Sequence, residues 1–347
     1  RSELAEEVLL DGVTLSVEAS FGVCFYPRDA DTVEALLQHA DFAMYQGKHG
    51  STGVVVYDPA TPQHATHSLV MQGELRAALE RNELVLYYQP KVDLDTGRVS
   101  CVEALVRWQH PERGLMLPSD FLPVAERSEL IEPLTSWVLR RALADHTAWT
   151  AAGQDWTVAV NVSGRNLGSL TFADTVHAIL EEAGVRPDRL HLEVTETALA
   201  FDTGVAGQVV GALAAQGIAM SIDDFGIGYT SLSQIRDLKV SEVKIDRTFV
   251  SGLPGNEQDR VIVRSVIDLG HSLGCLVTAE GVESQDVADW LVDAGCDHAQ
   301  GYLWSRAVPW TEISAVLEAT SSMTEPGSAE AVSATAPAGC ESERATI

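Results

Sequence analysis

The chain has 347 residues, of which 46% are hydrophobic, so it can bury the core of one large or two ordinary domains and is not a disordered chain. Fifty acidic residues against 23 basic ones give a formal net charge of −27, which argues against nonspecific binding to nucleic acid or to an anionic membrane. An anionic substrate would therefore need cations at its binding site.

The cysteines and the ends of the chain bear on its compartment. Five cysteines are scattered without a C-x-x-C pair, which predicts reduced, mostly buried thiols in the cytoplasm. No apolar run is long enough to cross a bilayer, and no signal peptide is visible. Because the chain begins with Arg1, we expect a piece of a longer protein, whose other segments could include a membrane anchor.

Residues 1–58 have the pattern of a strand, a helix and a second strand. The stretch 13–27 alternates and then turns, 32–48 has helical periodicity, and 52–58 is a short apolar run. One helix and two strands are too few elements for an independent α/β domain. Residues 59–68 carry Pro, Thr, Ser and His without periodicity and are predicted to be a linker.

Residues 69–319 form the second predicted unit. It opens with a helical segment at 69–83, and strands and helices then alternate. The expected strands lie at 84–90, 99–108, 157–163, 190–196, 218–225, 241–247, 275–283 and 297–302. Eight strands over roughly 240 residues favour an α/β fold of the (β/α)₈ barrel type, with a doubly wound sheet as the alternative. Residues 320–347 are rich in Ala, Ser, Glu, Pro and Thr and are predicted to be disordered.

The predicted strands share an unusual feature, because strands buried on both faces should be almost entirely apolar. Each one carries polar or charged residues near its carboxyl end, and in a barrel those ends converge on the face where active sites are built. The residues are Gln89, Glu103, Arg107, Asn161, Glu193, Glu196, Asp223, Asp224, Lys244, Asp246, Glu280, Glu283 and Gln300.

Several of these residues also have a structural interpretation. Glu196, Asp246 and Glu283 could satisfy free N–H groups at helix N-termini. Lys244 could face solvent, and Asn161 lies in an N-x-S glycosylation sequon, although that interpretation is weak for a cytoplasmic chain. The structural interpretation is poor for the carboxylates within or directly after apolar strands, which are costly to bury unpaired.

Carboxylates together with one amide form an all-oxygen set of ligands, which selects Mg²⁺ or Mn²⁺ before Zn²⁺. The acids are more numerous than one ion needs. The adjacent Asp223 and Asp224 suit two ions bridged by one carboxylate. No nucleophile triad is readable, so covalent hydrolysis is unsupported.

Seven ordered motifs give this part of the chain a specific resemblance. They are E-A-L-V-R-W (103–108), N-V-S (161–163), E-V-T-E (193–196), D-D-F-G (223–226), K-I-D-R (244–247), A-E-G-V-E (279–283) and Q-G-Y (300–302). From about residue 70 to 318 the chain resembles an EAL-type cyclic-di-GMP phosphodiesterase domain. Residues 11–50 are similar to the C-terminal part of a GGDEF diguanylate cyclase domain, but the G-G-D-E-F signature is absent, so we do not expect this chain to make the dinucleotide.

The resemblance implies a TIM-like barrel enzyme that opens cyclic-di-GMP to linear 5′-pGpG with two Mg²⁺ or Mn²⁺ ions. It implies that Lys244 hydrogen-bonds the nucleophilic water and acts in catalysis with Glu103 and Glu280. The implied metal ligands are Glu103, Asn161, Glu193 and Asp223 for one ion and Asp223, Asp224 and Glu280 for the other. By the same resemblance, Glu196 braces the loop after the Asp pair, and Glu283 and Gln300 support the metal ligands from nearby positions. The implied substrate contacts are Gln89, Arg107 and Asp246.

The chain departs from the family pattern at two places. Ile227 stands where the loop after the Asp pair usually has Thr, which could lower activity or alter its regulation. Trp304 and Ala307 replace the common Phe and Pro and should only repack the barrel rim.

Three functional interpretations follow. An active phosphodiesterase is favoured because every expected ligand is present. The alternatives are a catalytically weak EAL-type receptor that binds cyclic-di-GMP or a partner protein without cleavage, and a partner-regulated dimer that only exchanges signals. The resemblance implies a homodimer through the barrel domain. We expect neither a DNA or RNA partner nor direct membrane contact in this piece.

Overall fold

The computed structural model describes residues 8–10, 13–15, 21–33, 35–37, 39–40, 43–44, 54–58, 63–154, 156–200, 203–227, 238 and 240–323. The chain divides into two compact units, Arg1–Val70 and Met71–Ile347. Two expectations fall partly outside the described residues: the disordered tail at 320–347, which is described only to residue 323, and the short helix expected between the strands at 218–225 and 241–247, where residues 228–237 and 239 are not described.

The first unit contains two small sheets. Strands β3 (Phe21–Val23) and β4 (Val54–Val56) pair in parallel with helical residues between them in the chain, which confirms the predicted strand–helix–strand order. The hairpin of β1 (Val8–Leu10) and β2 (Val13–Leu15) was not predicted. Helix α2 (Gln63–Arg81) begins inside the segment expected to be a linker, so that segment is partly helical.

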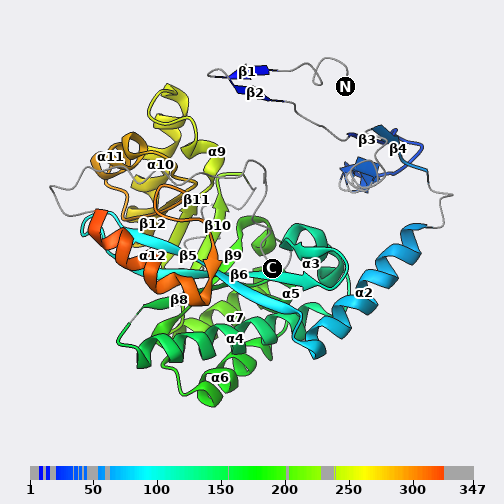
Figure 1. The fold of residues 1–347 in the computed structure, drawn as a ribbon, viewed down its shortest axis with the longest axis horizontal. Coiled ribbons are helices and arrows are strands. Elements are labelled where there is room, and N and C mark those ends of the chain that lie inside the picture. Colours follow the sequence, from blue (N-terminus) through cyan, green and yellow to red (C-terminus); the bar gives the residue numbers. More distant parts are fainter. Residues whose placement is uncertain are drawn as a thin grey trace. The chain divides into compact units, whose positions relative to one another are not determined.

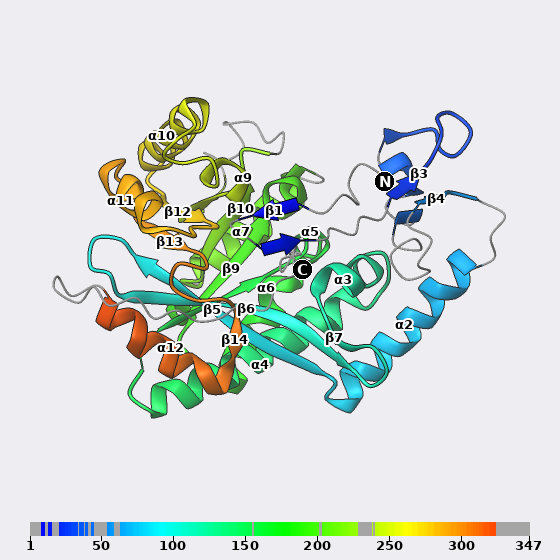
Figure 2. The same cartoon turned by 45° about the horizontal axis from the view of Figure 1, so that its top comes forward.

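The second unit is a closed eight-stranded barrel with helices outside it (Figures 1 and 2). The barrel order is β5, β13, β12, β11, β10, β9, β8 and β6, and pairing of β6 with β5 closes it. The strands are β5 (Leu84–Asp93), β6 (Val99–His110), β8 (Thr157–Asn161), β9 (Leu190–Thr195), β10 (Ala219–Phe225), β11 (Glu242–Ile245), β12 (Leu276–Glu280) and β13 (His298–Gln300). All eight predicted strands and the TIM-like barrel are confirmed. Short strands β7 (Gly114–Met116) and β14 (Val308–Pro309) extend the sheet and were not predicted.

The helices between these strands follow the expected alternation. Most of α2 lies in this unit. The other helices described in it are α3 (Pro118–Glu126), α4 (Ile131–Ala151), α5 (Gly164–Leu167), α6 (Phe172–Ala183), α7 (Thr203–Ala215), α9 (Arg247–Val250), α10 (Glu257–Ser272), α11 (Gln285–Asp293) and α12 (Trp310–Met323), with 3₁₀ turns η1 (Pro187–Arg189) and η2 (Glu196–Ala200). Helix α12 continues past the expected boundary at residue 319. No described helix combines the length and hydropathy needed to span a bilayer.

Strand β5 departs from the parallel arrangement expected of a (β/α)₈ barrel. It runs antiparallel to both of its barrel neighbours, β6 and β13. The cause is local. Only a tight turn through Asp93 and Gly97 separates β5 from β6, and such a turn reverses the chain, whereas parallel strands need a long crossover. Gln89 therefore lies within its strand and reaches the level of Glu103 through the register that pairs these two residues.

Side chains alternate between the two faces of the barrel wall, as in any strand. On the outer face, Trp108 packs edge-on against Phe121 of α3, with ring centroids 5.7 Å apart. Tyr88 packs against Trp149 of α4 and donates a hydrogen bond of 2.7 Å to Asp145. The apolar core thus lies between barrel and helices, which leaves the inner face of the barrel free to carry polar residues.

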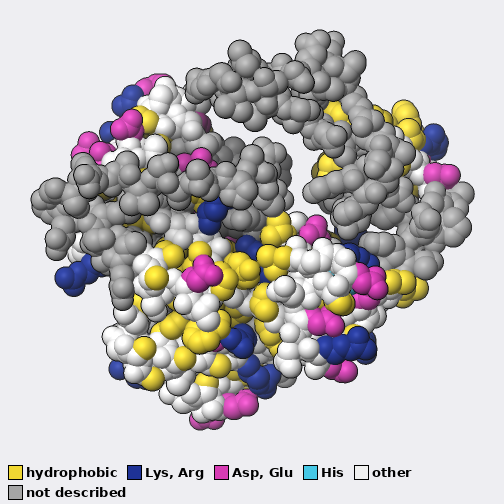
Figure 3. All heavy atoms as spheres, in the orientation of Figure 1, with side chains coloured by type: hydrophobic (Ala, Val, Ile, Leu, Met, Phe, Trp, Pro, Cys, Tyr) yellow, Lys and Arg dark blue, Asp and Glu magenta, His cyan; other side chains and the backbone are white. Residues whose placement is uncertain are grey.

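Charged side chains of both signs lie on the described surface (Figure 3). On the face shown in Figure 3, basic side chains are interspersed among the acidic ones over the described surface. The four described cysteines are free, and three of them are buried, as predicted.

Candidate functional site

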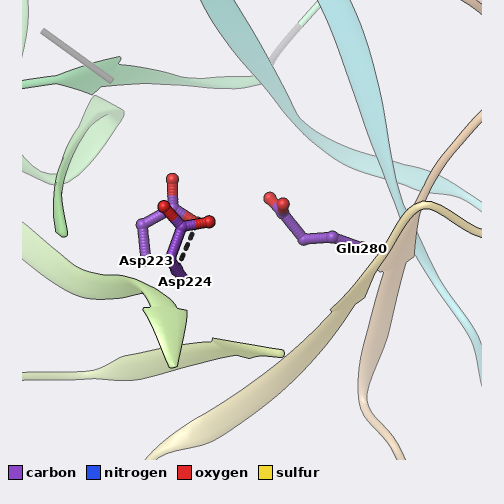
Figure 4. Close-up of side chains that lie close together, drawn as sticks. All are labelled: Asp223, Asp224 and Glu280. Carbon is purple, nitrogen blue, oxygen red and sulfur yellow. Dashed lines mark hydrogen bonds between the residues drawn. The ribbon is translucent and has the colours of Figure 1, made fainter. Parts of the chain in front are cut away.

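Three carboxylates meet at the carboxyl ends of two barrel strands. Asp223 and Asp224 lie together on β10, and Glu280 reaches toward them from the end of β12 (Figure 4). Each offers an oxygen within 4.8 Å of the others, a spacing that could hold a metal ion. Asp224 has a φ of 53°, a left-handed conformation that Asp tolerates better than most residues. This backbone turn places two consecutive carboxylates on one site.

Lys244 lies at the centre of the acidic residues. The alternative that its side chain faces solvent is therefore excluded. Its ammonium Nζ lies 2.6 Å from Glu193, 2.8 Å from Glu280 and 3.1 Å from Asp223. Glu103 is further away at 3.9 Å. These carboxylates come from β6, β9, β10 and β12, which can meet one side chain of β11 only inside the barrel. We call Glu103, Asn161, Glu193, Asp223, Asp224, Lys244 and Glu280 the carboxylate cluster.

Amide side chains hold Glu103 from both sides. Asn161 Nδ2 donates to one Glu103 oxygen at 2.8 Å, and Gln300 Nε2 donates to the other at 2.7 Å. Gln300 also lies 3.2 Å from the Gln89 side-chain oxygen, and Gln89 donates to the backbone oxygen of Ser305. The position of Glu103 is therefore fixed before any ligand binds. Asn161 is 3% exposed, which excludes the glycosylation interpretation.

Burial and mutual repulsion shift the pKa values of the cluster. Burial is the largest cause that raises the pKa of Asp224 to about 6, followed by the charge of Glu280. The same two causes raise the pKa of Asp223 well above its usual range. Burial alone would lower the pKa of Lys244, but the surrounding carboxylates raise it well above its usual value, so this side chain stays charged. Full ionisation of the carboxyl groups is therefore costly in the absence of a cation.

The described residues fit a divalent cation by their chemistry. Asn161 directs its Nδ2 to Glu103, whereas its buried Oδ1 has no hydrogen-bond partner among the described residues. A buried acceptor without a donor is costly, and a cation would satisfy it. Carboxylate and amide oxygens are ligands for hard cations. The identity of the metal stays a prediction.

The remaining predicted site residues lie at or near the rim. Glu196 accepts a hydrogen bond of 3.0 Å from the backbone N–H of Gly226, the contact that its predicted bracing role requires. Asp246 caps α9 by accepting from Thr248 at 2.8 Å, as its structural interpretation predicted, and its charge also raises the pKa of Asp224. Glu283 is exposed just before α11 and does not join the buried cluster.

Arg107 is buried at 2% exposure rather than displayed at the surface. Its Nη1 donates to the backbone oxygen of Val106 at 3.0 Å, and its guanidinium lies 5.7 Å from the centre of the Tyr87 ring. Its predicted contact with substrate stays a prediction.

A second polar group lies on the inner face of the barrel and was not predicted. Glu242 on β11 is 1% exposed, and both of its oxygens accept from the Lys91 ammonium of β5 at 2.7 and 2.8 Å. Thr278 of β12 donates to Glu242, and nitrogens of His191 and His298 lie 3.3 and 3.6 Å from its carboxylate. We call Lys91, His191, Glu242, Thr278 and His298 the floor cluster. Burial lowers the pKa of His191 to about 3, so this ring is neutral.

A periodicity of two residues could have revealed the floor cluster. His191, Glu242, Thr278 and His298 each precede a predicted site residue on the same strand by two positions. Lys91 instead follows Gln89 by two, as the reversed direction of β5 requires. Alternate residues of a strand share a face, so polar residues at this spacing belong inside the barrel.

Comparisons with known proteins agree with this arrangement. The family model "EAL domain" matches residues 72–307, and the model "Diguanylate cyclase, GGDEF domain" matches residues 1–53. The chain is 38% identical over 299 residues to the "Bifunctional diguanylate cyclase/cyclic di-GMP phosphodiesterase MucR" of Pseudomonas aeruginosa, covering 86% of this chain and 44% of that protein. It is 39% identical to the "Cyclic di-GMP phosphodiesterase NbdA" of the same organism, covering 91% and 41%. The chain thus spans less than half the length of these relatives.

Solved structures give the same fold. The structure titled "PaMucR Phosphodiesterase, c-di-GMP complex" has a TM-score of 0.67 and 40% identity and covers 70% of this chain and 99% of its own. The "EAL Enzyme Bd1971" in its "cAMP and cyclic-di-GMP bound form" has a TM-score of 0.70 at 27% identity and covers 84% of this chain and 77% of its own. The barrel, the order of its motifs and these matches together place the chain in the EAL domain family.

Proposed function

We propose that this chain hydrolyses cyclic-di-GMP to linear 5′-pGpG with two bound divalent cations, Mg²⁺ or Mn²⁺. The observation that carries the proposal is the surplus of buried carboxylates around Lys244, whose ammonium lies within 3.1 Å of three of them. One lysine cannot balance these charges, whereas two divalent cations can. Relatives named as cyclic-di-GMP phosphodiesterases and an EAL structure titled as a c-di-GMP complex support the choice of substrate.

The ligands divide between two ions. We assign Glu103, Asn161, Glu193 and Asp223 to one ion, and Asp223, Asp224 and Glu280 to the other. Bound cations would lower the pKa of a shared water and offset the charge that develops on the phosphate under attack. They would also let a protein of net charge −27 accept a substrate that carries two phosphodiester groups.

The protein's own side chains orient the reaction. Lys244 keeps its proton and is placed to donate a hydrogen bond to the attacking water or to a phosphate oxygen. Gln300 and Asn161 hold Glu103 in one orientation, which limits the reorganisation needed when substrate binds. Glu196 holds the turn after Asp224 through Gly226, so the second carboxylate of the pair keeps its position.

Product analysis tests this proposal. The purified chain is incubated with cyclic-di-GMP and Mn²⁺, and the nucleotides are separated by chromatography. We expect linear pGpG from the wild type and from Glu80→Gln, a control at an exposed helical position. We expect product formation by Glu103→Ala to be lower on the order of 10³-fold or more.

Tight binding of cyclic-di-GMP without product, at saturating Mn²⁺, would contradict hydrolysis and favour the receptor interpretation. Ile227 is the feature that favours this alternative. It is 55% exposed in the turn after Asp224, where it offers no hydroxyl group to the loop.

The homodimer stays a prediction. Val261 and Ile262 on α10 are 57% and 36% exposed, and exposed aliphatic side chains on one helix are compatible with a contact between barrels. Sedimentation equilibrium of the wild type and of Val261→Glu tests it. A monomeric wild type at micromolar concentration would contradict the prediction.

A further inference from the structure

The floor cluster holds a buried ion pair directly below the carboxylate cluster. Lys91 and Glu242 are 4% and 1% exposed, and both oxygens of the carboxylate accept from the ammonium. The two residues come from β5 and β11, which are not neighbours in the sheet, so the pair crosses the interior of the barrel.

The pair lies one layer below Lys244 and Gln89, which belong to the contacts around the assigned metal ligands: Lys244 contacts Glu193 and Glu280, and Gln89 contacts Gln300. Glu242 lies two positions before Lys244 on β11, and both side chains point inward. Lys91 lies two positions from Gln89, whose side-chain oxygen contacts Gln300. Each member of the pair is therefore attached through its strand to a residue of the upper site.

Two contacts of Glu242 lead toward the assigned metal ligands. His191, whose Nε2 lies 3.3 Å from the Glu242 carboxylate, precedes Glu193 by two positions on β9. Thr278, which donates a hydrogen bond to Glu242, precedes Glu280 by two positions on β12. Within the low-dielectric interior, a fixed charge at this position is felt by a bound cation as well as by a proton.

We propose that Lys91 and Glu242 are positioning residues for the divalent cations, forming a charge-balanced floor that keeps the potential at Glu193 suited to cation binding. This inference rests on the proposed metal site, though not on hydrolysis of a particular substrate. Loss of the Glu242 charge alone leaves the Lys91 ammonium unbalanced beneath the site, where it repels a cation. Loss of the Lys91 charge alone leaves the Glu242 carboxylate beneath the site, and a carboxylate does not repel a cation.

The test is Mn²⁺ binding to the apo protein, measured by titration calorimetry without nucleotide. We expect Glu242→Gln to weaken Mn²⁺ binding on the order of tenfold. Lys91→Met should bind Mn²⁺ no more weakly than the wild type, and the double variant should lie within about twofold of the wild type. Lys91→Arg, which keeps the charge, should behave as wild type.

A purely structural role gives a different pattern. The matched control is Asp145→Asn, which removes a buried carboxylate that pairs with Tyr88 and Arg141 outside the barrel. It should lower the melting temperature without changing Mn²⁺ affinity. If Glu242→Gln and Lys91→Met weaken Mn²⁺ binding equally, or if both only lower the melting temperature as Asp145→Asn does, the proposal is wrong.

The double variant removes both charges of the ion pair at once. A neutral replacement of a buried ion pair is often tolerated, so the double variant should fold even if a single variant does not. A folded double variant with a large loss of Mn²⁺ affinity would overturn the proposal. If the wild type binds Mn²⁺ but releases no pGpG, the proposed hydrolysis fails while the floor inference is still tested.

Discussion

Two lysines are buried inside the same barrel, and their surroundings differ. Lys91 pairs with one carboxylate, Glu242, so the floor cluster is close to neutral. Lys244 lies within 3.9 Å of four carboxyl groups, which carry more charge than one ammonium can balance when all of them are ionised. A buried ion pair can be structural, whereas an uncompensated group of buried carboxylates is costly and indicates a site for cations. Variants of the two clusters should therefore respond differently to added cations.

The largest expected effect is on catalysis at the carboxylate cluster. Glu103→Ala removes a predicted metal ligand and leaves Asn161 and Gln300 without their shared acceptor. We expect kcat/KM for cyclic-di-GMP to fall on the order of 10³-fold or more. Steady-state kinetics with Mn²⁺ measure this, and Glu80→Gln is the control. Full activity in Glu103→Ala would show that the site is wrongly assigned.

The next effect compares the two lysines by stability. Lys244→Met and Lys91→Met each leave buried carboxylates without a cation, and each should cost about 3–5 kcal/mol of unfolding free energy. Mn²⁺ should restore much of the stability of Lys244→Met, because cations can replace the ammonium among the carboxylates. It should restore little in Lys91→Met beyond the gain that the wild type shows.

Denaturant unfolding with Mn²⁺ or with a chelator measures this difference. Equal rescue of both variants would remove the distinction between the two layers.

Much of this arrangement could be predicted from the sequence, and the reasons are local. Asp223 next to Asp224 after an apolar strand predicts a charged strand end, and the carboxyl ends of parallel strands meet at one face. Asn161, Glu193 and Glu280 follow the same rule. The eight strands and their order were predictable because polar strand ends and helical periodicity alternate regularly along this part of the chain.

The rest depended on contacts between distant strands. The reversed direction of β5 follows from the tight turn between β5 and β6, which the alternation of strands and helices along the chain does not reveal. Glu242 and Lys91 are 151 positions apart in the chain, and neither indicates its partner by sequence alone. Glu283 satisfied the motif but lies exposed at the start of α11, because a strand-end position does not fix whether a side chain turns inward.

A smaller effect concerns pH. Burial is the main cause that raises the pKa of Asp224 from 3.8 to about 6 and of Glu193 from 4.5 to about 7. The folded apo protein therefore holds these protons more tightly than the unfolded chain does. Their contribution to stability is complete below about pH 4 and is lost as pH rises through about 6 to 7. Cation binding needs the deprotonated carboxylates, so Mn²⁺ affinity should rise over the same window.

Thermal unfolding between about pH 5.5 and pH 8 checks this sign. With a chelator the melting temperature should fall as pH rises, and saturating Mn²⁺ should reduce or reverse that fall. The same pH dependence with and without Mn²⁺ would contradict cation binding at these carboxylates.

The smallest expected effect is at Ile227. Its side chain is 55% exposed. Its backbone nitrogen lies 3.5 Å from the backbone oxygen of Asp224, and this contact does not depend on the side chain. Ile227→Thr should therefore change kcat/KM by less than about threefold. A gain of 100-fold would instead mean that this position holds the natural chain in a weakly active state.

The central claim is tested most directly by the origin of the oxygen in the product. The purified chain is incubated with cyclic-di-GMP and Mn²⁺ in oxygen-18 water, and the product is analysed by mass spectrometry. Direct attack by water on the phosphate predicts linear pGpG that carries one oxygen-18 atom, in its terminal phosphate. Absence of linear product, or product without the label, would contradict the account.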